Sequence, residues 1–363
     1  MNNSSPAITA RMYLTALGPR CPGPGDDNMA AADQSSAVWE LRLREGGTVR
    51  RLTLTPAGLQ QWAEGQPPAV RARVDELRER IGRPRKSIEG SDYATPVLMG
   101  IINVTPDSFS DGGEHADAEG AVAHGRRLAE AGARILDIGG ESTRPGAAAV
   151  GPAEEIRRVL PVIRALQELR RQSPKIALSI DTRHAATMRA ALEAGIDIIN
   201  DVSALTGDRD SLKVAAASRA DIVLMHMQGE PATMNLAPAY ADVALDVFDY
   251  LESRIEACAA AGIDRRRLIA DPGIGFGKRG PENLAILRDL GLFHGLGCPI
   301  LLGVSRKGFG DSTQALAPKD RLPTSIAAAT IAAARGVQIL RVHDVAETLQ
   351  ALAIWRGIAG SKA

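Results

Sequence analysis

The sequence has few cysteines, no net charge and no long apolar run, and each absence excludes a class of protein. Its three cysteines, Cys21, Cys258 and Cys298, are scattered and lack metal-ligand spacing, so we expect neither a disulfide framework nor a zinc site, and a reducing cytoplasm is favoured. Lys and Arg balance Asp and Glu at 43 each, which gives no reason to expect nucleic acid or an anionic membrane as partner. No apolar run approaches the length of a membrane span.

The chain is nevertheless 363 residues long and 45% hydrophobic, enough for one large core and a smaller appendage. Residues 1–36 are rich in Pro, Gly, Ser and Asn and show no periodicity, so we expect them to be disordered. Residues 37–95 are expected to form a small N-terminal α+β appendage that ends in a linker. Within it, the alternation of Trp39–Leu54 around a Gly-Gly turn predicts a β-hairpin.

Two helices should follow this hairpin. The stretch 56–63 and the apolar stripe in 68–81 have helical periodicity. The basic, breaker-rich segment 82–96 that comes next could be an anion-binding or oligomerising arm, but a solvated linker is the interpretation we favour.

From residue 96 to 360 the chain repeats a unit in which a short apolar run precedes a helical pattern. The eight runs are Val97–Asn103, Arg134–Gly140, Ile176–Asp181, Ile196–Asp201, Ile222–Met227, Leu268–Pro272, Ile300–Ser305 and Gln338–Asp344. Strict alternation of strand and helix implies parallel strands with right-handed crossovers. Eight units in roughly 265 residues predict an α/β fold, a (β/α)8 TIM barrel, with a doubly wound open sheet as the alternative.

Each of these runs turns polar at its carboxyl end, and in a barrel these ends meet on one face. The polar residues are Asn103, Asp137 with Glu141–Arg144, Asp181, Asn200 with Asp201, His226, Asp271, Ser305–Lys307 and Arg341–Asp344. Helix capping could account for one or two of them, because Asp, Asn, Ser and Thr are the preferred N-caps. It does not account for Lys307, Arg341 or His343.

One set of these groups has the chemistry to bind a flat nitrogen heterocycle. It consists of Asp181, Asn200, Asp271 and Lys307, whose carboxylates, amide and ammonium can pair with the donors and acceptors of an amino-pyrimidinone edge. We therefore expect a heterocycle in the mouth of the barrel.

A second set has the chemistry to bind a pyrophosphate. It consists of Arg144, Arg341 and His343, with Asn103 as a possible oxygen ligand to Mg²⁺, which holds phosphates with one or two protein ligands. No Ser-His or Cys-His nucleophile arrangement is present in the sequence pattern. A heterocycle with a diphosphate leaving group indicates group transfer.

Eight ordered blocks at these strand ends carry a resemblance to a known family. They read NVTPDSFSDGG, DIGGESTRPGA, SIDT, IINDVSAL, LMHMQGEP, DPGIGFGK, PILLGVSRK and ILRVHDV. Together they resemble the dihydropteroate synthases of folate biosynthesis, from about residue 96 to 360. The resemblance implies a transferase that condenses 7,8-dihydropterin-6-ylmethyl diphosphate with p-aminobenzoate and releases 7,8-dihydropteroate and pyrophosphate.

The resemblance also implies a role for each matching residue. Asn103 would be the Mg²⁺ ligand. The pterin contacts would be Thr143, Asp181, Asn200, Asp271 and Lys307. The diphosphate would be bound by Arg144, Arg341, Val342 and His343, and the p-aminobenzoate wall would be formed by Phe276, Ser305 and Lys307. The catalytic set would be Asp181, Arg144, Lys307, Arg341 and His343, in a cytoplasmic homodimer that is a sulfonamide target.

The available groups favour a mechanism in which the C–O bond to the diphosphate breaks first and Asp181 stabilises the resulting methylene cation. The loops 103–113 and 140–146 would close over the site, with Phe109 in the lid or packed against a neighbouring molecule. A corrinoid-linked methyltransferase and a non-catalytic pterin-binding barrel are the alternatives. The former has less use for the diphosphate set, and the latter does not explain why no site group has been lost.

Overall fold

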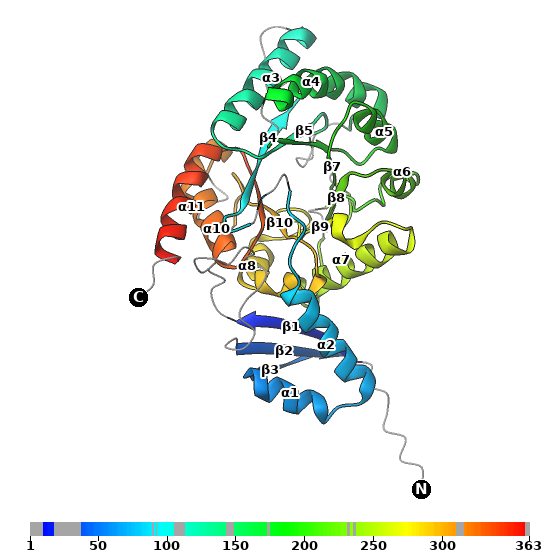
Figure 1. Ribbon diagram of the computed structural model, residues 1–363, viewed down its shortest axis with the longest axis vertical. Helices are drawn as coiled ribbons and strands as arrows, with labels where there is room; N and C mark the ends of the chain where they lie inside the picture. Colours follow the sequence, from blue (N-terminus) through cyan, green and yellow to red (C-terminus); the bar gives the residue numbers. More distant parts are fainter. Residues whose placement is uncertain are drawn as a thin grey trace.

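The structure is a computed structural model that describes residues 10–17, 38–88, 91, 93–104, 113–142, 149–172, 175–230, 233–234, 237–309 and 316–359. In these ranges the chain forms a ring of parallel strands surrounded by helices, with a small N-terminal domain against one side of the ring (Figure 1). No helix in the described ranges has the length and apolar character needed to cross a membrane.

The ring is a closed eight-stranded parallel barrel. Its strands are β4 (Val97–Asn103), β5 (Ile135–Gly139), β6 (Ala177–Asp181), β7 (Ile198–Asp201), β8 (Asp221–Met225), β9 (Leu268–Asp271), β10 (Leu301–Gly303) and β11 (Ile339–Val342). They pair in the order β10-β11-β4-β5-β6-β7-β8-β9, and a bridge between Ala270 and Ile300 joins β9 to β10. This closure confirms the (β/α)8 barrel and excludes the open sheet.

Helices follow the strands around the outside of the barrel. They are α3 (Gly113–Glu130), α4 (Pro152–Gln172), α5 (Ala185–Glu193), α6 (Ser211–Ala217), α7 (Val243–Ala260), α8 (Gly280–Arg288), α10 (Leu322–Ala334) and α11 (Val345–Ala359). The most clearly capped of them is α7. It starts at Val243 because the Asp242 carboxylate accepts hydrogen bonds from the first amides of the helix.

The interior of the barrel has an apolar lower layer and a mainly polar upper layer. The lower layer is formed by Val97, Met99, Ile135, Ala177, Ile198, Val223, Ile269, Leu301 and Ile339. Because side chains alternate along a strand, the next inward positions lie two residues further on. They are Ile101, Asp137, Ser179, Asn200, Met225, Asp271, Gly303 and Arg341. The polar positions therefore lie towards the carboxyl ends of the strands.

The lower layer is closed from below by the segment that we expected to be a solvated linker, and that expectation is wrong. Ile88 and Tyr93 are buried against the lower layer, and Tyr93 donates a hydrogen bond to the Lys86 carbonyl at 3.1 Å. Arg85 is also buried, and its guanidinium donates to the carbonyls of Arg80 and His294. Burial lowers the pKa of Arg85 to about 10. The segment is the floor of the barrel.

The N-terminal domain contains a three-stranded antiparallel sheet and two helices. Its elements are β1 (Arg11–Leu17), β2 (Val38–Glu45), β3 (Thr48–Leu54), α1 (Pro56–Glu64) and α2 (Pro68–Gly82). The predicted hairpin is confirmed as β2 and β3, and the two predicted helices as α1 and α2. The expectation of disorder for residues 1–36 is wrong at β1, which pairs with β2 along its whole length. Its central residues are all buried, so no alternation marks it as a strand.

The domain lies against α7 and the 3-10 helix η3 (Leu290–Leu296), and β1 is the strand of its sheet that lies nearest the barrel (Figure 1). Leu77 and Ile81 of α2 belong to the same buried core as Phe248 and Phe293. Domain and barrel therefore share one hydrophobic core, which favours a fixed arrangement.

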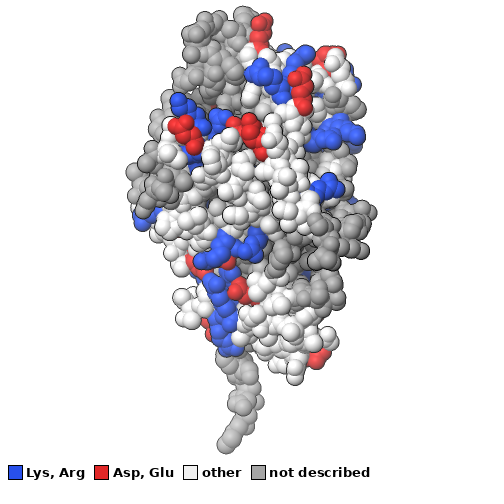
Figure 2. Space-filling model, turned by 90° about the vertical axis from the view of Figure 1, so that its left-hand side faces the viewer, with Lys and Arg blue, Asp and Glu red and all other residues white. Residues whose placement is uncertain are grey.

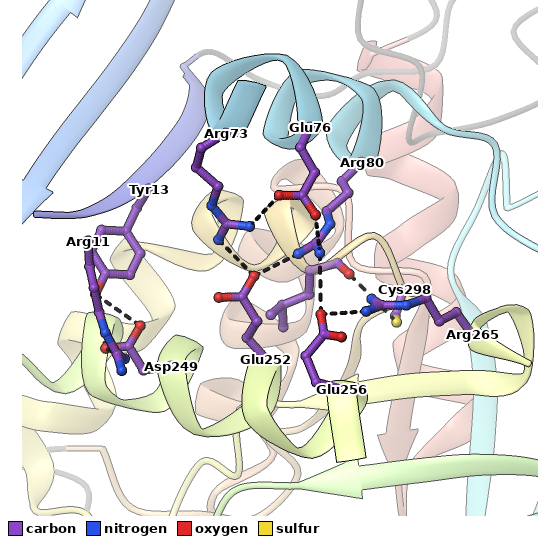
Figure 3. A network of polar contacts seen from close by, with 11 residues as sticks. Arg11, Tyr13, Arg73, Glu76, Arg80, Asp249, Glu252, Glu256, Arg265 and Cys298 are labelled. Atoms are coloured by element: carbon purple, nitrogen blue, oxygen red, sulfur yellow. Dashed lines mark hydrogen bonds and ion pairs between the residues drawn. The ribbon is translucent and has the colours of Figure 1, made fainter. Parts of the chain in front are cut away.

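Ion pairs surround this shared core on the α7 side (Figure 3). Arg73 and Arg80 of α2 both donate to Glu252, each at 2.7 Å. Tyr13 of β1 donates to the carboxylate of Asp249 at 3.0 Å. These contacts are partly buried, so the cost of removing the charges from water offsets much of their attraction, and we expect their main effect to be to fix the register in which α2 and β1 lie along α7.

The floor residue Ile88 provides a test of this packing. We expect Ile88→Ala to lower the free energy of unfolding by about 2 to 4 kcal/mol, because a truncation there leaves a cavity against the lower layer. Val38→Ala is the control, since Val38 is 42% exposed and its truncation should cost less than about 0.5 kcal/mol. Urea unfolding of both variants measures the difference, and equal effects would show that the segment does not close the barrel.

Candidate active site

A buried cluster of charges occupies the upper layer of the barrel. Arg341 of β11 extends between two carboxylates, with Nε 2.6 Å from Asp137 of β5 and a terminal nitrogen 2.7 Å from Asp181 of β6. Asn200 of β7 donates from its amide to the same oxygen of Asp137 at 3.1 Å. Four strands that are up to 204 residues apart in the sequence thus supply one hydrogen-bonded group.

A second cluster lies beside the first and involves β9 and the segment after β10. The Lys307 ammonium lies 4.5 Å from the centre of the Phe276 ring and donates to the Ile274 carbonyl. Burial lowers the pKa of Lys307 to about 8, although the attraction of Asp271 opposes the shift. Burial likewise raises the pKa of Asp271, opposed by a hydrogen bond from the Gly273 amide.

The carboxyl group of Asp181 also has a raised pKa. Burial raises its pKa to about 7, and the neighbouring carboxylates act in the same direction, whereas Arg341 opposes them. A carboxyl group with this pKa can hold or release a proton near neutral pH. Asp181 can therefore lose its proton, and become negatively charged, when a positive charge develops next to it.

Two buried acceptors of the upper layer have no partner among the residues that the structure describes. They are Oδ1 of Asp137 and Oγ of Ser179, both on side chains that are fully buried. A buried polar atom without a partner is costly, and such atoms point to a ligand, an ion or a water. Asn200 lies on the adjacent strand β7, and Asp271 lies in the same layer on β9. Together these groups suit a flat ring that carries several N–H donors.

The residues assigned to the diphosphate do not all lie together. The ring of His343 contacts the Ser305 hydroxyl at 3.0 Å, and the neighbouring Arg306 pairs with Asp344 at 2.5 Å. Arg341 instead extends into the barrel with Asp137 and Asp181. Arg341 is therefore not part of an outward cationic clamp, although the sequence interpretation had placed it in one.

Val342 does not face the interior at all. Its side chain is buried in the core between the barrel and the outer helices, because it alternates with Arg341 along β11. Only its backbone is available to a ligand, and the assignment of Val342 to the diphosphate stays a prediction.

Asn103 lies half-buried at the carboxyl end of β4, and no hydrogen bond joins its side chain to another described residue. Within the described ranges, no group of three or more His, Cys, Asp or Glu side chains could hold a metal ion. Thr143, Arg144, Phe109 and most of the two proposed lid loops lie outside the described residues.

The loop after β9 is held by a buried lysine that the sequence interpretation missed. Lys278 donates to the carbonyls of Gly273 and Phe276, each at 2.9 Å, and its ammonium lies 2.9 Å from Nδ1 of His226. Burial lowers the pKa of Lys278 to about 7 and that of His226 to about 2, so the histidine is neutral and can accept. The glycine-rich DPGIGFGK block is the signal that could have indicated a tightly folded loop here.

Comparisons with known proteins agree on one family. The family model for pterin binding enzymes matches residues 99–343. The dihydropteroate synthase of Escherichia coli K12 is 43% identical over 271 residues, which cover 75% of this chain and 94% of that protein. The family match thus begins after the N-terminal domain.

Solved structures give the same result. A Xanthomonas albilineans dihydropteroate synthase with 4-aminobenzoic acid superposes with a TM-score of 0.69 at 49% identity, covering 74% of this chain and 95% of that one. The enzyme of the same organism in complex with 7,8-dihydropteroate superposes with a TM-score of 0.66 at 46% identity, covering 74% and 96%.

The charge cluster predicts an unusual pH dependence of stability for one variant. In Arg341→Met two buried carboxylates lose their cation, which we expect to cost about 3 to 5 kcal/mol of unfolding free energy at pH 8. The folded variant can recover stability only by binding protons, so its deficit relative to the wild type should shrink as the pH falls to 6.

Urea unfolding at the two pH values measures this deficit, with Arg341→Met/Asp137→Asn as the matched control. Removing one of the two charges should restore part of the stability at pH 8. A deficit that is independent of pH would contradict the proposed coupling of the three side chains.

Proposed function

The chain belongs to the pterin-binding enzymes, and among them to the dihydropteroate synthases, and on this basis we propose which of its residues carry out the reaction. The protein is a transferase of folate biosynthesis. It condenses 7,8-dihydropterin-6-ylmethyl diphosphate with p-aminobenzoate to give 7,8-dihydropteroate and pyrophosphate. The observation that supports our residue assignment most directly is the set of partly unpaired buried acceptors in the mouth of the barrel.

The pterin ring binds in the upper layer, where Asp271, Asn200 and Lys307 pair with its polar edge. Asp137 joins this set, because its buried Oδ1 has no other described partner and can accept from the ring. Arg341 lies beside the same space, and its planar guanidinium can stack on a flat heterocycle. Thr143 is retained as a further pterin contact on the strength of the sequence alone.

In the reaction the C–O bond between the pterin methylene and the diphosphate breaks, and the p-aminobenzoate nitrogen forms a C–N bond to that methylene carbon. The amine proton leaves and pyrophosphate is the other product. Asp181, when ionised, stabilises the positive charge that the dihydropterin carries in between, and Arg341 keeps its carboxylate oriented. Its pKa of about 7 means that this stabilisation is strongest above neutral pH.

The diphosphate lies outside the ring pocket, where His343 and Arg144 neutralise part of its charge. Asn103 is suited to be the single protein ligand of Mg²⁺, because it offers one amide oxygen at a strand end, and no described residue competes for that oxygen. When bound, Mg²⁺ would supply further neutralisation of the leaving group.

The p-aminobenzoate ring lies against Phe276 and the stem of Lys307, with Ser305 next to them. A sulfonamide that imitates this acceptor would compete for the same wall. The relatives reported above are synthases, so neither the corrinoid-linked methyltransferase nor the non-catalytic barrel is needed. A cytoplasmic location stays a prediction from the scarcity of cysteine.

Release of pyrophosphate tests this function. Purified protein should release pyrophosphate from the pterin diphosphate only when p-aminobenzoate is present, and EDTA should abolish the release until Mg²⁺ is restored. Asp181→Asn should lower kcat by roughly 100-fold, as expected for the loss of a charge that acts in the transition state. Release that does not depend on p-aminobenzoate would contradict the synthase assignment, and full activity in EDTA would contradict the metal.

We further propose that the enzyme is a homodimer that associates through α10 and α11. Ile331, Ile354 and Ile358 on these helices are 51%, 68% and 73% exposed, and Ile354 and Ile358 are one helical turn apart. In Figure 2 the face over these helices is largely free of charged side chains. An exposed apolar face of this kind on a chain without net charge favours a second copy as the partner.

Light scattering after gel filtration tests the dimer. The wild type should have twice the mass of the chain, and Ile354→Glu/Ile358→Glu should reduce it to the monomer with little change in Tm, because both side chains are exposed. Val38→Glu, a charge introduced at another exposed apolar residue, should leave the dimer intact. An unchanged mass in the double variant would place the interface elsewhere.

A further inference from the structure

The proposed acceptor wall depends on the shape of the loop after β9, which runs from Pro272 to Arg279. This loop presses closely on the segment after β8. A Cβ at Gly273 would come within 2.0 Å of the His226 carbonyl oxygen, and one at Gly277 within 2.8 Å of the Gln228 carbonyl oxygen. Both glycines also have positive φ, at 69° and 59°. At these two positions the backbone of the β9 loop therefore packs directly against the backbone of the segment after β8.

Tyr240 joins these two loops near the aromatic wall. Its hydroxyl donates to the Gly277 carbonyl oxygen at 2.6 Å, one residue after Phe276. Lys278 in turn donates to the Phe276 carbonyl itself, at 2.9 Å. The backbone that carries the Phe276 ring is therefore fixed by one donor at each of two successive carbonyls.

Tyr240 is itself held from both directions. The residue before it, Ala239, makes two hydrogen bonds with the Gln228 side chain, at 2.9 and 3.1 Å. The residues after it, Ala241 and Asp242, donate from their amides to the carboxylate of Asp246 at the start of α7. Tyr240 thus lies in a short segment, residues 239–242, whose backbone is held by hydrogen bonds on both sides of the tyrosine.

This segment is also connected to the N-terminal domain. Arg44 of β2 pairs with Asp246 at 2.6 Å, on the carboxylate oxygen that the amides of the segment leave free. The domain therefore supports the segment from outside the barrel. No proposed substrate contact lies on Tyr240, Asp246 or Arg44.

We propose that Tyr240 is a positioning residue for the aromatic amine acceptor: its hydroxyl holds the β9 loop so that the Phe276 ring faces the Lys307 ammonium. The proposal rests on the assignment of Phe276 to the p-aminobenzoate wall. The pterin pocket is built mainly from strand ends, so it depends much less on this hydrogen bond. The two substrates should therefore respond differently to its loss.

The test is Tyr240→Phe, which removes the hydroxyl and keeps the ring. We expect the KM for p-aminobenzoate to rise roughly threefold to tenfold, the range that corresponds to one hydrogen bond. The KM for the pterin diphosphate and kcat should change by less than about twofold, since the chemistry and the first pocket are untouched. Steady-state kinetics with each substrate varied in turn separates these quantities.

Tyr250→Phe is the matched control. Tyr250 packs edge-on against His226 at 4.9 Å, while Tyr240 lies against the same ring at 6.0 Å. The Tyr250 hydroxyl reaches the Ser203 carbonyl at 3.4 Å and not the β9 loop. Tyr250→Phe removes a tyrosine hydroxyl beside His226, as Tyr240→Phe does. We expect Tyr250→Phe to leave the KM values for both substrates unchanged.

A rise of the p-aminobenzoate KM alone, in Tyr240→Phe alone, supports the proposal. Equal rises of both KM values, an equal effect of Tyr250→Phe, or no effect of Tyr240→Phe would each overturn it. These outcomes are distinct from a failure of the proposed function, in which the wild type would show no pyrophosphate release that depends on p-aminobenzoate.

Discussion

The burial of charge inside a closed barrel is the constraint on which the rest of this structure depends. Side chains alternate along short parallel strands, so the inward positions above the apolar layer must either be apolar or find partners inside the ring. Here Arg341 reaches both Asp137 and Asp181, which keeps two buried carboxylates tolerable. Among the described residues, Ile88 and Tyr93 close the lower end of the barrel, so we expect a ligand to reach the charges from the carboxyl ends of the strands.

The pairing within the barrel is incomplete, and this incompleteness is what suits it to a substrate. Asp137 Oδ1 and Ser179 Oγ have no partner among the described residues, which costs stability, and a ring with N–H donors would supply partners for them. The β9 loop is held by Lys278 and Tyr240, and through Asp246 and Arg44 its support extends to the N-terminal domain. The proposed pterin site is thus formed mainly by residues on the strands, and the proposed acceptor site mainly by residues on the loops that follow them.

The sequence predicted the barrel because few other folds accommodate eight short apolar runs that each become polar at the carboxyl end. It did not predict which face of a strand such as Ile135–Gly139 points inward, since all five residues are buried, and Asp137 was therefore not assigned to the site. The floor was missed for another reason. Arg85 suggests solvent in a sequence, but its partner carbonyl at His294 lies 209 residues away. Strand β1 was missed because a long breaker-rich stretch separates it from β2.

A crystal structure of the complex with 7,8-dihydropteroate tests the central claim most directly. The account predicts that the pterin ring lies inside the barrel mouth, donates to Oδ1 of Asp137 and to Asp271, and has the Arg341 guanidinium beside its plane. A ring bound outside the mouth, with Asp137 Oδ1 still unpaired, would contradict it.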